Sequence, residues 1–205
     1  MDACRSRGFR ATLSICLAVA VLPSVVGCGA LTALTTLSSQ VDDSQTTDPV
    51  DLSSGDGACD TNFVADYSTL GLDLPSDASE SPDFDPDEQA VFSMAWVFAV
   101  GGITITLEAE ATTASFPSDL SQIVEAADEE VSLAGGSVND PIDLVLANGD
   151  AATLTSYSQD GVLYYRVNTL KSDTSYVVTA SVAEDDLTQE IDNAMVSAVT
   201  SLCVE

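Results

Sequence analysis

The sequence predicts an α+β domain in which helices pack on an antiparallel β-sheet of about six strands, an arrangement like an α/β/α sandwich. Three observations lead to this fold class. Apolar and polar residues alternate along several short segments in the second half of the chain, as in strands that bury one face. Turn-forming dipeptides separate these segments. Two other segments repeat their apolar residues every three to four positions, as amphipathic helices do.

The first 27 residues have the organisation of a bacterial signal peptide. Three arginines lie within the first ten residues, and residues 11–26 form an uncharged, mostly apolar run. The run ends in Val25-Val26-Gly27-Cys28, which resembles the lipobox of bacterial lipoproteins, where a small residue precedes the lipidated cysteine. The resemblance implies that residues 1–27 are removed and that Cys28 becomes an acylated N-terminus. Two or more acyl chains anchor a protein stably, since each buried CH₂ contributes about 0.8 kcal/mol.

An uncleaved transmembrane helix is the alternative for this segment. No charged residue lies between Arg10 and Asp42, a stretch long enough to span a bilayer. Pro23, the two glycines that flank Cys28 and the Ser/Thr-rich residues 32–39 argue against a continuous apolar helix. We therefore expect an exported protein that its lipid anchors to a bacterial membrane, at the outer membrane or at a periplasmic or extracellular face.

The mature chain divides into a tether and one domain. Residues 28–58 hold the lipidated N-terminus and an acidic run rich in Ser, Thr and Asp, which cannot form a core and is expected to be flexible. Residues 59–205 suffice for a single globular α+β domain. Cys59 and Cys203 lie at its two ends, and in an oxidising compartment a disulfide between them is the simplest expectation. Free buried thiols and an intermolecular bridge are the alternatives.

The charge of the chain excludes some partners. The formal net charge is −28 at pH 7, and after residue 27 the only basic residues are Arg166 and Lys171. Such a chain repels phosphate backbones, so we expect no nucleic-acid binding. It also repels anionic headgroups, which leaves membrane attachment to a lipid or an apolar helix. The acidity fits either solubility in a salty habitat or a docking face for a cationic partner.

Strand alternation is clearest on the two sides of Gly101-Gly102. A two-residue loop at these glycines pairs position 100 with 103, 98 with 105 and 96 with 107. Both apolar rows of the hairpin then lie on one face of the sheet, while Glu108 and Glu110 lie on the other.

The other elements follow in chain order. A helical period begins after Ser118-Asp119 and continues to Val131. Strands are expected at residues 142–147, 151–158, 162–168 and 175–182, separated by Asn148-Gly149, Asp160-Gly161 and the turn Lys171-Ser172-Asp173. In this arrangement Tyr157, Tyr164 and Tyr176 share one face. A final helix is expected to begin at Asp186 as its N-cap, with Gln189 three residues on.

The order of the elements after Ala151 resembles a known superfamily. A hairpin around Val162-Leu163-Tyr164-Tyr165-Arg166-Val167, a strand at residues 176–182 and an acidic helix start at Glu184-Asp185-Asp186 follow one another. This order is similar to that of the PsbP-like α/β/α superfamily, which includes DcrB-like and LpqN-like bacterial lipoproteins. Leu72-Asp73-Leu74-Pro75 matches the early strand and proline of those proteins, but Ser76-Asp77-Ala78 replaces the tryptophan that often follows. The resemblance implies accessory or binding roles and supplies no catalytic residues.

The residue inventory argues against several kinds of chemistry. The chain has no histidine, which excludes Ser-His-Asp and Cys-His catalysis and every His-based metal site. Aspartates alternate in residues 83–88 as in a calcium loop, but Glu88 and Met94 occupy the positions of the glycine and the bidentate glutamate of an EF-hand. A looser calcium site is the alternative to a solvated acidic loop. We expect no catalytic residues, no metal site and no cofactor.

The predicted function is therefore a non-catalytic binding or accessory module, presented from a membrane in the cell envelope, with an envelope protein as a possible partner. The candidate contact residues are Tyr157, Tyr164, Arg166 and Tyr176, for which burial beneath a helix is the competing interpretation. The alternative functions are a carboxylate-dependent hydrolase and a passive structural component of the envelope. The hydrolase predicts a concave pocket that contains a carboxyl with a raised pKa.

Cys28→Ala is expected to abolish incorporation of a labelled fatty acid, because it removes the acylated thiol. Metabolic labelling followed by electrophoresis measures this. Cys59→Ser is the matched control and should retain the label. Undiminished labelling of Cys28→Ala would contradict the lipoprotein interpretation.

Overall fold

The computed structural model describes residues 48–53, 59–65, 70–88, 90–113 and 119–205. The predicted signal peptide and Cys28 lie outside the described residues, as does most of the predicted tether. Residues 50–51 fall within the tether range and form strand β1 (Val50–Asp51), which pairs in parallel with β8 (Ile142–Val145). Part of the range assigned to the tether thus belongs to the folded domain.

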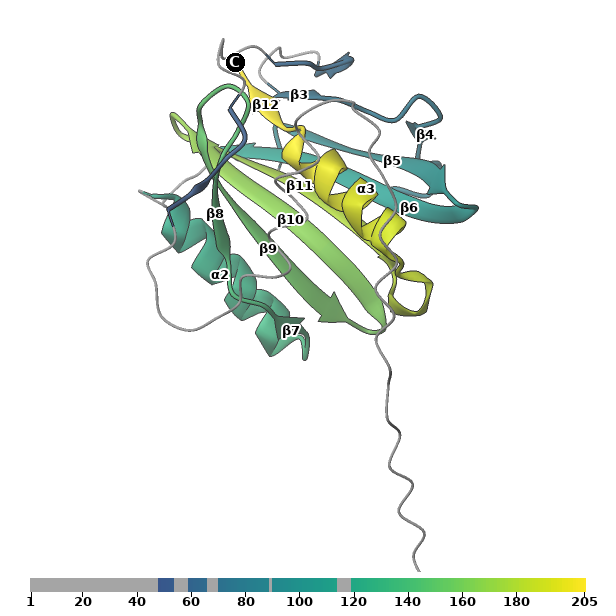
Figure 1. Ribbon diagram of the computed structural model, residues 1–205. Helices are drawn as coiled ribbons and strands as arrows, with labels where there is room; N and C mark the ends of the chain where they lie inside the picture. Colours follow the sequence, from purple (N-terminus) through teal and green to yellow (C-terminus); the bar gives the residue numbers. More distant parts are fainter. Residues whose placement is uncertain (1–47, 54–58, 66–69, 89, 114–118) are drawn as a thin grey trace, which may run out of the picture.

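The described part of the chain forms two sheets and two α-helices (Figure 1). The larger sheet has nine strands, in the order β1-β8-β9-β10-β11-β6-β5-β4 with β7 paired to β9, and the smaller has the order β12-β3-β2. The remaining elements are β2 (Phe63–Val64), β3 (Leu70–Leu72), β4 (Ser79–Glu80), β5 (Phe92–Val100), β6 (Ile103–Thr113), α2 (Leu120–Leu133), β7 (Ser137–Val138), β9 (Ala151–Gln159), β10 (Val162–Lys171), β11 (Thr174–Ala183), the 3₁₀ turn η2 (Glu184–Asp186), α3 (Gln189–Thr200) and β12 (Cys203–Val204).

The predicted α+β class agrees with this architecture, but the estimate of about six strands is wrong. The strands β5, β6, β8, β9, β10 and β11 agree with the six predicted strands. The other six are β3, which has three residues, and β1, β2, β4, β7 and β12, which have two residues each. A two-residue strand is too short to show a period of two in the sequence, because its pairing depends on a neighbour that is distant in the chain.

The β5–β6 hairpin has the predicted register, with Val100 opposite Ile103, Phe98 opposite Ile105 and Trp96 opposite Leu107. Gly101 and Gly102 adopt φ values of 59° and 87°. Both values lie in the left-handed region, which a two-residue hairpin turn requires and which glycine enters without steric cost. The apolar row that results forms the centre of the core.

The two helices cover opposite faces of the large sheet. Neighbouring positions on β10 point to opposite faces. Tyr165 donates a hydrogen bond to Asp192 of α3, while Arg166 donates one to Asp128 of α2. Figure 1 shows α3 lying across the sheet and α2 beside β8 and β9. The domain therefore has three layers, in the order helix, sheet, helix.

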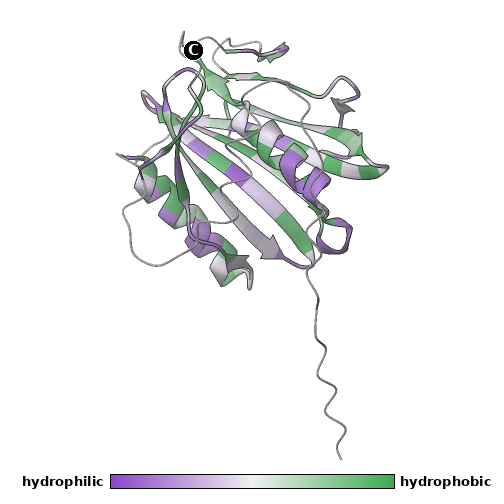
Figure 2. Ribbon diagram, in the orientation of Figure 1, coloured by the Kyte–Doolittle hydropathy of each residue, from purple (hydrophilic) through white to green (hydrophobic). Residues whose placement is uncertain are grey.

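The face beneath α3 carries the main hydrophobic core. Its central side chains are almost inaccessible to solvent: Ile105, Leu107, Val167, Val178, Met195 and Val199. Figure 2 shows hydrophobic and hydrophilic residues interspersed along both helices, as in amphipathic helices with one face on a sheet. The predicted N-cap of the last helix is wrong. Asp186 ends the turn η2, and the side chain of Thr188 caps α3 by accepting a hydrogen bond of 3.3 Å from the backbone N–H of Ile191.

The C-terminal strand β12 is linked to the rest of the domain by a disulfide and by side-chain hydrogen bonds. Cys203 forms the predicted disulfide with Cys59, with the two Cα atoms 5.9 Å apart. The carbonyl oxygen of Val204 accepts hydrogen bonds from Lys171 Nζ at 2.6 Å and from Asn148 Nδ2 at 2.8 Å. Neither α2 nor α3, the two α-helices of the described residues, combines the length and the apolar character needed to span a membrane.

The Cys59→Ser/Cys203→Ser double variant is expected to unfold at lower urea concentration than the wild type. The disulfide closes a loop with a sequence separation of 144 residues. In the chain-entropy model such a loop corresponds to a loss on the order of 4–5 kcal/mol in the free energy of unfolding. Wild type treated with dithiothreitol is the control and should match the double variant. Equal urea midpoints for the oxidised wild type and the double variant would contradict a stabilising disulfide.

Candidate functional site

The sheet face beneath α2 is unusually polar. The pairing of β9, β10, β11 and β6 places Thr155, Arg166, Thr179 and Glu108 in one row across this face. The next row contains Thr153, Asn168 and Glu110. Arg166 is 7% exposed and Asn168 is 1% exposed. Thr153 and Thr155 are also buried. Because polar side chains are costly to bury, the buried members of these two rows make this face a candidate for a functional role.

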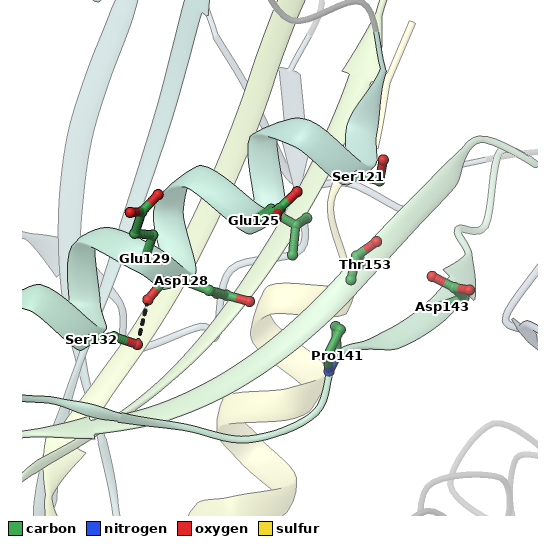
Figure 3. Close-up of a pocket in the computed structure, with 9 residues that line it drawn as sticks. Ser121, Glu125, Asp128, Glu129, Ser132, Pro141, Asp143 and Thr153 are labelled. Atoms are coloured by element: carbon green, nitrogen blue, oxygen red, sulfur yellow. Dashed lines mark hydrogen bonds between the residues drawn. The ribbon is translucent and has the colours of Figure 1, made fainter. Parts of the chain in front are cut away.

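A groove of about 710 Å³ lies between α2 and the strands β8 and β9. Figure 3 shows its two walls, with side chains of α2 on one side and of β8 and β9 on the other. Asp143 of β8 and Thr153 of β9 are directly opposite each other in the strand pairing. The lining residues are Ser121, Val124, Glu125, Asp128, Glu129 and Ser132 from α2, with Pro141, Asp143 and Thr153 from the strand side.

The ends of α2 explain how the groove wall is positioned. At the start, the Asp119 side chain accepts a hydrogen bond of 3.0 Å from the backbone N–H of Gln122. At the end, the N–H groups of Gly135 and Gly136 bond the carbonyls of Ser132 and Val131, which is a Schellman motif. A Cβ on Gly136 would lie only 2.6 Å from Val131 Cγ1 and 3.0 Å from the carbonyl oxygen of Ser158. Glycine therefore allows the helix end to approach β9 closely.

Arg166 connects α2 to the polar sheet face. Its guanidinium forms an ion pair with Asp128 and lies 5.1 Å from the ring centroid of Tyr157, within the range of a cation–π contact. The rings of Tyr157 and Tyr164 stack with centroids 4.7 Å apart. Burial raises the pKa of Asp128, and the guanidinium of Arg166 opposes that rise with a smaller effect.

The structure brings together three of the four predicted contact residues. Tyr157, Tyr164 and Arg166 are in contact on the α2 face. Tyr176 is opposite Thr169 and lies on the α3 face, so its predicted place beside Tyr164 is wrong. The cause is the turn before β11. Lys171 pairs with Thr174, which leaves the two residues Ser172 and Asp173 in the loop, and a change of one residue in a hairpin loop moves every following side chain to the other face.

Four buried polar atoms beneath α2 have no hydrogen-bond partner within the described residues. They are the Thr155 hydroxyl, the Nε of Arg166 and both amide atoms of Asn168. The three residues are neighbours on β9 and β10. The sequence contained one signal for them, since Arg166 and Asn168 alternate with the apolar residues of β10.

A second, smaller acidic cavity lies on the same sheet face, farther from α2. It measures about 150 Å³ and is lined in part by Asp85, Asp87, Glu108 and Glu110. Burial raises the pKa of Glu108, and the neighbouring charge of Glu110 raises it further. Asp85 and Asp87 belong to the acidic segment 83–88, for which the sequence leaves a loose calcium site as an alternative to a solvated loop. Within the described residues, no three carboxylates or cysteines are placed to hold one metal ion.

Replacing both residues of the Arg166–Asp128 pair is expected to lower the free energy of unfolding less than replacing Asp128 alone. Asp128→Leu leaves the buried guanidinium of Arg166 without a counter-charge, which we expect to cost about 3 kcal/mol. Asp128→Leu/Arg166→Met removes both charges and should recover part of that loss. Urea unfolding gives the free energy of unfolding of the wild type, of these two variants and of Arg166→Met, which together form a double-mutant cycle.

Glu129→Leu is the control for the substitution at Asp128, because Glu129 is exposed on the same helix. We expect it to change the free energy of unfolding by no more than about 0.5 kcal/mol. Strictly additive effects at Asp128 and Arg166 would show that the two residues are not energetically coupled.

The chain shows only limited similarity to known proteins and solved structures. No protein-family model and no curated protein matches the chain. Among solved structures, the chain is similar to the crystal structure of LpqN, involved in cell envelope biogenesis of Mycobacterium tuberculosis. The TM-score is 0.43 and the sequence identity is 19%, with 66% of this chain and 82% of that chain covered. At this TM-score the similarity carries no conclusion about fold or function, and the resemblance to the PsbP-like superfamily stays a prediction.

Proposed function

We propose that the protein is a lipid-anchored, non-catalytic binding module of the bacterial cell envelope, and that the groove beside α2 receives its partner. The N-terminal pattern that ends at Cys28 supports export and anchoring. The Cys59–Cys203 disulfide supports an oxidising compartment outside the cytoplasm. The tether between Cys28 and β1 would hold the domain away from the membrane surface.

The groove is the observation that carries the binding role. Its volume of about 710 Å³ is in the range of ligand sites in proteins. Both walls belong to regular elements, since α2 is capped at both ends and β9 lies inside the large sheet. Walls that are already ordered before binding reduce the conformational entropy that is lost when a partner binds. A groove of this kind favours a partner-binding role over a passive structural role.

The two serine hydroxyl groups of the groove support a non-catalytic role. Ser121 donates its hydroxyl to the carboxylate of Asp119 at 2.7 Å, and Ser132 donates its own to the backbone carbonyl of Asp128 at 2.8 Å. Both hydroxyls thus bond within the turns of α2. A nucleophilic serine instead requires a base that a third group orients towards it, and the chain has no histidine for that task.

A carboxylate-dependent hydrolase is the second candidate, and Asp128 is the observation that favours it. This carboxyl lines the groove, and burial raises its pKa, as a general acid requires. However, Asp128 also accepts a hydrogen bond from Arg166. A carboxylate held by a guanidinium is poorly suited to carrying a proton to a substrate, so the binding role is the stronger proposal.

In-situ crosslinking of the anchored protein tests the binding role. A photo-reactive amino acid at Ser121 or Ser132, both exposed on the groove wall, should capture one dominant envelope protein. The same group at Asp185, in the turn η2, is the matched control and should not capture it. Mass spectrometry then names the partner.

Cys28→Ala should strongly reduce capture, because the unanchored domain no longer stays at the membrane. Equal capture from Ser121, Ser132 and Asp185 would argue against a role of the groove. No protein captured from any position would argue against a protein-binding module.

A further inference from the structure

We infer that helix α2 is a lid on the sheet: it opens while the rest of the domain stays folded, and its opening exposes a polar layer formed by Thr155, Arg166 and Asn168. The lid goes beyond the proposed binding function and does not require it. Three features of the described residues lead to it. They are the sparse apolar packing of α2, its low stability as an isolated helix and the unpartnered polar atoms beneath it.

The apolar packing of α2 on the sheet is sparse. Of its 14 residues, Val124 and Val131 are buried, whereas α3 buries five of its 12 residues. Neither valine belongs to the hydrophobic core cluster, which includes all five of those α3 residues. Because most of the stability of a helix in a protein comes from the packing of its apolar face, α2 is held less strongly than α3.

Helix α2 is also a weak helix by itself. An isolated helix of this length is marginally stable in water. Glu125 and Glu129 are four residues apart, so their like charges repel each other on the helix surface. Glu129 and Glu130 lie near the C-terminal end, where the helix dipole disfavours negative charge, and the last turn contains no basic residue. Once α2 leaves the sheet, we therefore expect its own hydrogen bonds to open as well.

The polar layer disfavours the closed position of α2. Thr155 is 0% exposed, Arg166 is 7% exposed and Asn168 is 1% exposed. The Thr155 hydroxyl, Arg166 Nε and both amide atoms of Asn168 nevertheless have no hydrogen-bond partner among the described residues. Buried polar groups without partners raise the free energy of the closed state, and water bonds them when the layer is uncovered. Opening therefore offsets part of the apolar packing that it loses.

The ion pair of Arg166 with Asp128 holds the closed position. The chain that follows α2 stays on the sheet, because β7 pairs with β9. Gly135, with a φ of 87°, lies between α2 and β7. Hinge motions are absorbed by a few residues at the ends of elements, so we expect α2 to pivot at this position.

Opening connects the polar layer to the groove. In the closed state, which is the one the structure describes, the strand side of the groove is lined by Pro141, Asp143 and Thr153. Thr153 is directly opposite Asn168, so the layer lies next to this side of the groove. Because α2 forms the other side, its movement makes the layer and the groove one continuous surface. Arg166 then becomes accessible to a partner.

Hydrogen–deuterium exchange of the mature protein, with its disulfide intact, tests the opening. Mass spectrometry of peptides from α2 and α3 gives the protection factor of each helix. We expect α2 to be at least about tenfold less protected than α3, because α2 exchanges through a local opening and α3 through global unfolding. Low concentrations of urea should accelerate the exchange of α2 less than that of α3, since the local opening exposes less surface. Equal protection and equal urea dependence would overturn the lid, because the two helices would then unfold as one unit.

Thiol labelling tests whether the layer itself becomes exposed. Thr155→Cys places a thiol in the layer, and Val178→Cys is the matched control at a position that is also 0% exposed but lies on the α3 face. Iodoacetamide should modify Thr155→Cys at least about tenfold faster than Val178→Cys, and mass spectrometry of the labelled peptide locates the modification. Equal rates in two variants that melt at the same temperature would overturn the exposure of the layer.

Two further variants test the forces that hold α2 closed. Asp128→Asn removes the ion pair and should lower the protection factor of α2 by about tenfold or more. Glu129→Gln, at an exposed position of the same helix, is its control and should stay within about twofold of the wild type.

Thr155→Val/Asn168→Leu tests the layer without changing any charge. It removes three of the four unpartnered atoms and should raise the protection factor of α2 several-fold. A lower protection factor of α2 in this double variant would overturn the role of the layer, because it would show that the polar side chains stabilise the closed state.

Discussion

The contact of Arg166 with Asp128 is the interaction on which the polar side of this domain depends. It joins α2 to the centre of a sheet face that lacks a full hydrophobic core, whereas α3 is held on the opposite face by apolar packing. A buried ion pair adds little to stability compared with a well-packed apolar pair. It does define one position of α2, because the guanidinium of Arg166 has no other carboxylate partner among the described residues. The position of α2 in turn defines the groove beside it, so Arg166, the only arginine after residue 27, acts mainly as a positioning residue.

The elements that could be predicted from the sequence are those whose information is local. Gly101-Gly102 and Asp160-Gly161 adopt the positive φ values that tight hairpin turns need, and the hairpins β5–β6 and β9–β10 follow from them. Ser172 also has a positive φ, 55°, which serine seldom adopts, so the sequence indicates a turn at residues 171–173 but not that its loop has only two residues. The register of β11 was therefore placed one residue out, and Tyr176 was assigned to the wrong face.

Only part of the candidate site could be predicted from the sequence, because some of its residues come together only through tertiary contacts. Tyr157, Tyr164 and Arg166 were recognised from their alternation along two neighbouring strands. Asp128, Asp143 and Thr153 come from a helix and two strands, and only the docking of α2 brings them to one groove. That docking depends on Gly136 and on the ion pair, neither of which has a local pattern. Carboxylates are so frequent in this chain that no single one could be selected from the sequence.

The carboxylates of the groove and the buried polar atoms of the neighbouring sheet face both weaken the isolated domain. Like charges along α2 and β8 repel each other, and the amide of Asn168 lacks the hydrogen bonds it would have in water. An apolar residue in place of Asn168 would leave no buried amide unpaired, so stability alone does not explain this side chain. Residues that lower the stability of a domain are common where function, rather than packing, determines the side chain. The polar face beneath α2 is therefore the part of the domain where a functional role is to be sought, whereas the apolar face beneath α3 is explained by packing.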